Sequence, residues 1–235
     1  MQQQQNRSAL EISLKKFNVI ILFVAIFAIS SASEDYESYI RSVKGTRDSL
    51  HTEYIKSADS IKREIVFFSK YYLLNQIVDK SFIFWSGTKW DFYGNTRIPR
   101  TGNISCGYFV TTVLYDIGLN IPRVSWAESA SEVFITKLSR NIKRFRNKPI
   151  ADVLSYVNSK PEGLYMVGLD CHVGFIYSFH NRVRFVHANY YRPEIGVMEQ
   201  ELNSKNPLMD SKYRILGRIL DNEMVVNWLT YNKYQ

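Results

Sequence analysis

Cysteine is scarce in this chain, which has only Cys106 and Cys171 among its 235 residues. Neither lies in a CxxC pair, and no HxxxH pair occurs, so the spacings typical of a zinc site are missing. The sequence also lacks internal repeats, and it has no motif typical of nucleic-acid binding. We therefore expect no metal, no cofactor and no nucleic-acid partner.

A long transmembrane stretch is missing as well. The longest apolar run, FNVIILFVAIFAIS, is too short to cross a membrane comfortably. It follows two lysines and precedes Ser31 and Ser33, a pattern typical of a secretory signal peptide. Residues 1–33 are predicted to be that signal peptide, with an uncleaved N-terminal anchor, the only expected membrane contact, as the alternative. The remaining protein is then exported, to the periplasm or the extracellular space.

Positive charge is in excess. The chain has 30 Lys and Arg against 22 Asp and Glu, and a chain that begins at Glu34 keeps a net charge of +6. This balance favours anionic surroundings such as an envelope polymer or lipid headgroups. The densest basic run, KLSRNIKRFRNK at residues 137–148, is interpreted as a solvated helix face, with a ligand-binding patch as the alternative.

The apolar pattern divides the chain into a helical half and a strand-rich half. Residues 34–80 have no proline and one glycine, and they are predicted to form a helical N-terminal extension. Residues 126–157 again look helical. The last third contains GLYMVGL, HVGFIYSF, RVRFVHANY, IGVMEQEL and YRILGRIL, which are typical of strands. We predict an α+β fold in which residues 81–235 form the main domain, with an antiparallel sheet at its C-terminal end.

Cys106 stands where an amphipathic helix is predicted to begin. The helix places five apolar residues on one face, and Gly118 and Pro122 end it; the five are Phe109, Val110, Val113, Leu114 and Ile117. The first turn of a helix carries unpaired N–H groups and the positive end of the helix dipole. These should lower the pKa of the thiol, and the thiolate is the nucleophilic form.

Three of the four histidines belong to one predicted hairpin. If its turn centres on His180 and Asn181, alternation places His172, His187 and Asn189 on one face of the sheet. Cys171 then points to the opposite face and is predicted to be a buried thiol, out of reach of a disulfide with Cys106.

The sequence combines a cysteine that opens a helix, a histidine in a later strand and a polar partner on the same face. This combination is typical of nucleophilic catalysis. Cys106 would be the nucleophile and His172 the base, and His187 or Asn189 would orient the base. A buried core cysteine and a structural histidine remain the plain alternative.

At these residues the sequence resembles the NlpC-type cell-wall cysteine peptidases of the papain-like superfamily. The shared segments are SCGYFVTTVLYDIGLNIPR, HVGFIY, FVHA and YRILGRIL, and the resemblance covers about residues 84–220. It implies a papain-like fold, with Cys106, His172 and His187 as the catalytic residues. An aromatic residue ahead of the cysteine would complete the oxyanion hole; in WDFYGN the candidates there are Trp90, Tyr93 and Asp91.

The resemblance is weakest beside the nucleophile. Ser105 stands where the family usually has Asp, Gly107 and Tyr108 replace a Ser-Gly pair, and Tyr108 is expected to narrow the site or move the cleft. The resemblance implies an enzyme of the bacterial envelope that cleaves an amide bond in peptidoglycan stem peptides, typically between D-glutamate and the diamino acid. The alternatives are a papain-like acyltransferase or lipid-acting thiol enzyme, and a non-catalytic envelope binding protein. No protein partner is indicated.

Overall fold

A computed structural model describes residues 36–234 of the chain, so the predicted signal peptide lies outside the described residues. Within this range no helix is both long enough and apolar enough to cross a membrane. The helices are α2 (Tyr36–Lys56), α3 (Asp59–Gln76), the π-helical turn η1 (Ile77–Ser81), α4 (Phe82–Trp85), α5 (Cys106–Asp116), α6 (Arg123–Ala127), α7 (Ser131–Leu138), α8 (Ile150–Asn158), α9 (Pro207–Asp210) and α10 (Asn222–Leu229).

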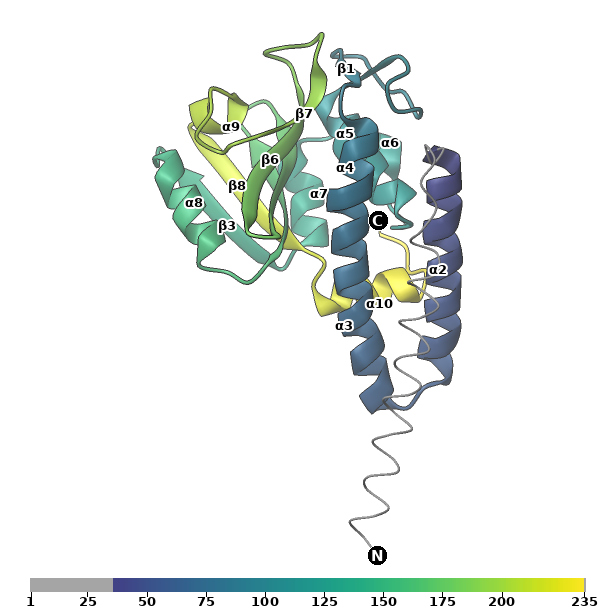
Figure 1. The fold of residues 1–235 in the computed structure, drawn as a ribbon. Helices are drawn as coiled ribbons and strands as arrows, with labels where there is room; N and C mark the ends of the chain where they lie inside the picture. Colours follow the sequence, from purple (N-terminus) through teal and green to yellow (C-terminus); the bar gives the residue numbers. More distant parts are fainter. Residues whose placement is uncertain (1–35, 235) are drawn as a thin grey trace, which may run out of the picture. The chain divides into compact units, whose positions relative to one another are not determined.

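The strands confirm the predicted α+β class. They are β1 (Lys89–Trp90), β2 (Asn103–Ile104), β3 (Asn141–Arg146), β4 (Gly163–Leu169), β5 (Val173–Phe179), β6 (Arg182–Asn189), β7 (Gly196–Gln200) and β8 (Tyr213–Ile219). The last six form one antiparallel sheet in the order β3-β8-β4-β5-β6-β7 (Figure 1). All five segments that were predicted to be strands in the last third of the sequence are strands here.

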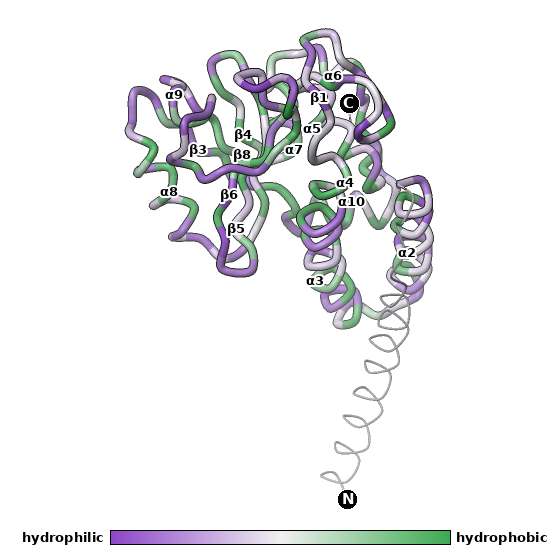
Figure 2. Tube along the Cα trace, turned by 45° about the horizontal axis from the view of Figure 1, so that its top comes forward, coloured by the Kyte–Doolittle hydropathy of each residue, from purple (hydrophilic) through white to green (hydrophobic). Residues whose placement is uncertain are grey.

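Helices cover both faces of the sheet because its central strands are apolar on both faces. One core joins the sheet to α3, α4, α5 and α7, and a second, smaller core lies between the sheet and α8. In β4 every residue is buried, as expected for a strand covered on both faces. Figure 2 shows the apolar residues concentrated along the strands and on the inner sides of the helices.

The predicted helical extension shares the larger core with the residues that follow it. Leu73 and Ile77 are fully buried in this core, beside residues of α5. A buried hydrogen-bond chain adds a polar link, because Trp85 Nε1 donates to Tyr36 Oη and Tyr36 Oη donates to Asp116 Oδ2. Residues 36–234 therefore lie within one compact unit.

The β5–β6 hairpin has the predicted register. Phe179 pairs with Arg182 and Phe175 with Val186, so the turn consists of His180 and Asn181. Both turn residues have positive φ, 52° and 58°, as the two central positions of a type I′ turn require. The even-numbered loop fixes which side chains share a face, and this places His172 and His187 together.

One predicted helix segment is wrong. Residues 126–157 were predicted to be helical in two pieces divided near Pro149, but Asn141–Arg146 in the first piece form strand β3, which pairs with β8 along its whole length. The basic run at 137–148 is therefore an edge strand with its flanks, rather than a solvated helix face. Its Lys and Arg side chains hid the strand pattern, because only Phe145 and, in part, Ile142 are buried.

Candidate active site

Helix α5 begins at Cys106 with its first N–H groups uncapped by a side chain. Ser105 occupies the N-cap position with extended backbone, but its hydroxyl makes no capping hydrogen bond. Its own N–H donates to Gly94 O at 2.8 Å, which attaches the preceding loop to the helix start. The sequence thus places a thiol beside backbone donors that a typical N-cap serine would satisfy.

Gly107 explains one departure from the family pattern. A Cβ at this position would lie 2.2 Å from the carbonyl oxygen of Ala127 in α6, which is far inside contact distance. The close approach of α6 therefore requires glycine directly after the cysteine. Tyr108 points to the same neighbour, since its hydroxyl donates to Glu128 at 2.8 Å and Arg123 stacks on its ring.

The two hairpin histidines are hydrogen-bonded to each other. His172 Nε2 lies 2.8 Å from His187 Nδ1, and His187 Nε2 lies 2.8 Å from Gln200 Oε1 at the end of β7. Both histidines are buried. Gln200 was not predicted from the sequence, but the structure makes it the last member of this chain of three side chains.

The chain of hydrogen bonds fixes which nitrogen carries each proton. Gln200 Oε1 can only accept, so His187 Nε2 donates and His187 Nδ1 is left as an acceptor in the neutral ring. His172 Nε2 therefore donates to His187, and the neutral ring of His172 has a free lone pair on Nδ1. Within residues 36–234 this buried Nδ1 has no hydrogen-bond partner. A base is thus available at one defined atom.

The thiol of Cys106 lies beside the backbone of Val173, the residue that directly follows His172 in the sequence. The backbone N–H groups of Val173, Gly107 and Cys106 itself favour the thiolate and act to lower the pKa of the thiol. Burial nevertheless raises the pKa of the thiol above its ordinary value, because desolvation outweighs the three donors. The lowered pKa expected from the helix start is therefore wrong for the resting site.

Both histidines are also held in the neutral form. Burial and the neighbouring His187 hold the pKa of His172 well below its usual range, and burial lowers the pKa of His187 to about 4. A thiol with a raised pKa and an imidazole with a lowered pKa form a neutral pair at pH 7, not a thiolate–imidazolium pair. Any reaction would then move the proton from sulfur to nitrogen as the sulfur attacks.

Cys171 is exposed, which corrects the prediction of a buried thiol. It lies in the tight turn between β4 and β5, closed by the hydrogen bond from Leu169 N to His172 O, so strand alternation does not govern it. Both cysteines are free. Cys171 Sγ lies 3.8 Å from Tyr190 Oη, and the Tyr190 ring packs edge-on against His172. Cys171 and Tyr190 therefore form an outer rim beside the base.

The aromatic candidates differ in position. Trp90 is half-buried and packs against Tyr190, and its buried Nε1 has no hydrogen-bond partner among the described residues. Tyr93 is 84% exposed, and its ring packs edge-on against Phe92. Asp91 accepts a hydrogen bond from the Tyr93 backbone N–H and so shapes the loop. Of these three, Trp90 is the one that the structure brings to the histidines.

Asn189 has other partners than the base. Its Oδ1 accepts from Tyr191 N at 2.8 Å, and its Nδ2 contacts the sulfur of Met198. His187, rather than Asn189, is the side chain hydrogen-bonded to His172.

Arginine side chains attach the loop between β1 and β2 to the C-terminal half of helix α5. Arg97 forms an ion pair with the buried Asp116 at 2.8 Å, and Arg123 donates to Asn95 O at 3.1 Å. Gly94 lies so close to the backbone of Asn103 and Ile104 that a Cβ would approach to 2.6 Å. The loop that carries Trp90 is therefore fixed on the same support as Cys106.

Among residues 36–234, no group of three or more His, Cys, Asp or Glu side chains is placed to hold a metal ion. Comparisons with family models, with curated proteins and with solved structures found no match.

Proposed function

We propose that this protein is a cysteine hydrolase that cleaves an amide bond, with Cys106 as nucleophile, His172 as general base and His187 as the residue that orients the base. One observation carries the proposal. His172 donates through Nε2 to His187, which leaves a buried, unpartnered Nδ1 on the residue next to the one whose N–H favours the Cys106 thiolate.

The reaction follows from this arrangement. The Cys106 thiol gives its proton to His172 Nδ1 while the sulfur bonds to the carbonyl carbon of the substrate. The backbone N–H of Cys106, at the uncapped start of α5, stabilises the oxyanion, and Trp90 Nε1 is our candidate for a second donor. His172 then protonates the leaving amine, and a thioester forms on Cys106. Water that loses a proton to His172 hydrolyses the thioester and releases the acid.

The substrate class is an inference from the resemblance and from charge. The NlpC-like segments favour peptidoglycan stem peptides, and the net charge of +6 that remains without residues 1–33 suits an anionic wall polymer. Export through residues 1–33 would place the enzyme beside that substrate. We further propose that the α+β fold is of the papain-like type.

Mass spectrometry of peptidoglycan digested with the purified protein tests the proposal. We expect new stem-peptide fragments with a free amine, lost in Cys106→Ala and kept in Cys171→Ala, which is the matched control because each variant retains one cysteine. His172→Ala should lose the products as well. Equal fragments from wild type and Cys106→Ala would remove the assignment, and release of fatty acid from lipid substrates would favour the lipid-acting alternative.

A further inference from the structure

The two edge strands of the six-stranded sheet, β7 and β3, differ in their backbone hydrogen bonds. The segment between α4 and β1 covers the outer edge of β7, since Gly87 N donates to Val197 O and Val197 N donates to Thr88 O, both at 2.8 Å. At β3 the backbone of residues 142–146 makes no hydrogen bond to any described residue outside its ladder with β8. Every second residue of β3 therefore directs an unpaired N–H and C=O away from the sheet.

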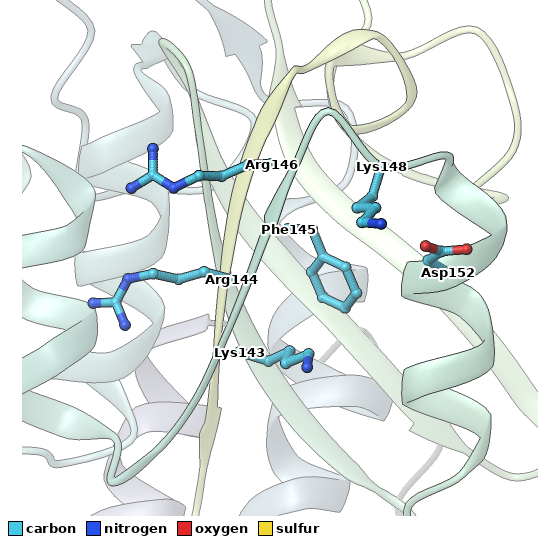
Figure 3. A pocket seen from close by; sticks show the side chains of 6 residues that line it. All are labelled: Lys143, Arg144, Phe145, Arg146, Lys148 and Asp152. Carbon is cyan, nitrogen blue, oxygen red and sulfur yellow. The ribbon is translucent and has the colours of Figure 1, made fainter.

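Cations flank this open edge on both sides. In Figure 3, Lys143 and Lys148 lie toward α8 on either side of Phe145, whereas Arg144 and Arg146 point to the other side of the strand. With Asp152 of α8, these residues line a shallow hollow of about 380 Å³. Phe145 is 5% exposed and anchors the strand.

Few of these charges are neutralised within the described chain. Arg144 is paired with Glu132 at 2.6 Å, and Arg146 stacks on the ring of Tyr213. No carboxylate of residues 36–234 lies within ion-pair distance of Lys143, Arg146 or Lys148. The edge therefore presents unpaired backbone groups together with unpaired positive charge.

We propose that β3 is a docking edge for an extended acidic peptide segment of a partner protein, which adds as a seventh strand. Main-chain hydrogen bonds to β3 would hold the segment, and its carboxylates would meet Lys143 and Lys148 on one face and Arg146 on the other. A second copy of this chain does not fit, because β3 against β3 would bring cations against cations. The same charges thus repel basic strands and favour acidic ones.

The competing explanation is that the cations only protect an open edge from aggregation. Fluorescence anisotropy separates the two, with a labelled, end-capped peptide of alternating Glu-Glu and Thr-Thr pairs as the probe and full-length Cys106→Ala as the protein. We expect saturable binding that weakens with salt. The same peptide with N-methylated backbone should bind roughly tenfold more weakly or worse, because N-methylation removes the main-chain hydrogen bonds.

Charge reversal at the edge supplies the matched control. The variant Lys143→Glu/Lys148→Glu should lose binding of the acidic peptide roughly tenfold or more and gain binding of a Lys/Thr peptide of the same design. The variant Lys44→Glu/Arg63→Glu, which makes the same charge change at exposed positions of α2 and α3, should bind like the parent. Equal binding of the N-methylated peptide, equal loss in both variants, or binding of inorganic polyphosphate without binding of the peptide would each overturn strand addition.

Discussion

The hydrogen bond from His187 to Gln200 predicts a specific loss of catalysis when its acceptor is removed. In Gln200→Leu the buried Nε2–H of His187 loses Gln200 Oε1, its partner at 2.8 Å. The tautomer that keeps His172 Nδ1 free for Cys106 then loses its advantage, because either proton order leaves one buried N–H without an acceptor, on His187 Nε2 or on His172 Nδ1. The lost hydrogen bond would also be stronger by about 1–1.5 kcal/mol once the histidine pair becomes charged in the transition state, so we expect kcat to fall roughly 5- to 12-fold with KM unchanged.

Gln200→Glu is the conservative control, since its carboxylate also accepts from His187 Nε2. It should keep most of the activity and should move the acid limb of the pH–rate profile upward, because a negative charge favours protonated histidine. The ¹⁵N shifts of the His172 ring should show a free Nδ1 in wild type and in Gln200→Glu, and a mixture of tautomers in Gln200→Leu. An unchanged kcat in Gln200→Leu would show that Gln200 does not set the tautomers of His187 and His172. An equal loss of activity in both variants with unchanged ring shifts would show the same.

Three further predictions concern the neutral site and its packing. Because the pKa of folded His187 is about 4, against about 6.5 when unfolded, the unfolded chain binds this proton first as pH falls. Stability should therefore drop by about 2–3 kcal/mol between pH 7 and 4.5; chemical denaturation should show a smaller drop in His187→Gln, and an equal drop would refute this cause. Gly107→Ala should cost about 1–3 kcal/mol in thermal unfolding through its clash with Ala127 O, whereas Gly45→Ala, with open space around it, should be neutral or stabilising. Iodoacetamide should alkylate Cys106 in Cys171→Ala with an apparent pKa above the ordinary cysteine value; a value below it would show that the neutral-pair description is wrong.

Local pattern predicted much of the fold and of the site. The register of β5 and β6 followed from a turn at His180 and Asn181, and alternation then placed His172 beside His187. The start of α5 at Cys106 followed from the apolar spacing after it. These features depend on residues that are close in sequence, or on a short turn that fixes pairing, so periodicity is sufficient.

Longer-range features could not be predicted in this way. Gln200 reaches His187 because His187 pairs with Met198 across β6 and β7, and the loop between these strands gave no register from sequence. β3 looked helical because an edge strand buries few side chains. The raised pKa of Cys106 depends on burial by the assembled domain, whereas the helix start alone argued for the opposite shift.

The central claim is that Cys106 forms a covalent acyl intermediate with the help of His172. The most direct test is to mix the protein with stem-peptide fragments of peptidoglycan, quench in acid, and map the mass of each cysteine-containing peptide. We predict an acyl adduct on the peptide that contains Cys106, none on the peptide that contains Cys171, and loss of the adduct in His172→Ala. An adduct on Cys171 would contradict this mechanism. So would turnover of the fragments that leaves the Cys106 peptide unmodified at every quench time and continues at the same rate in Cys106→Ala.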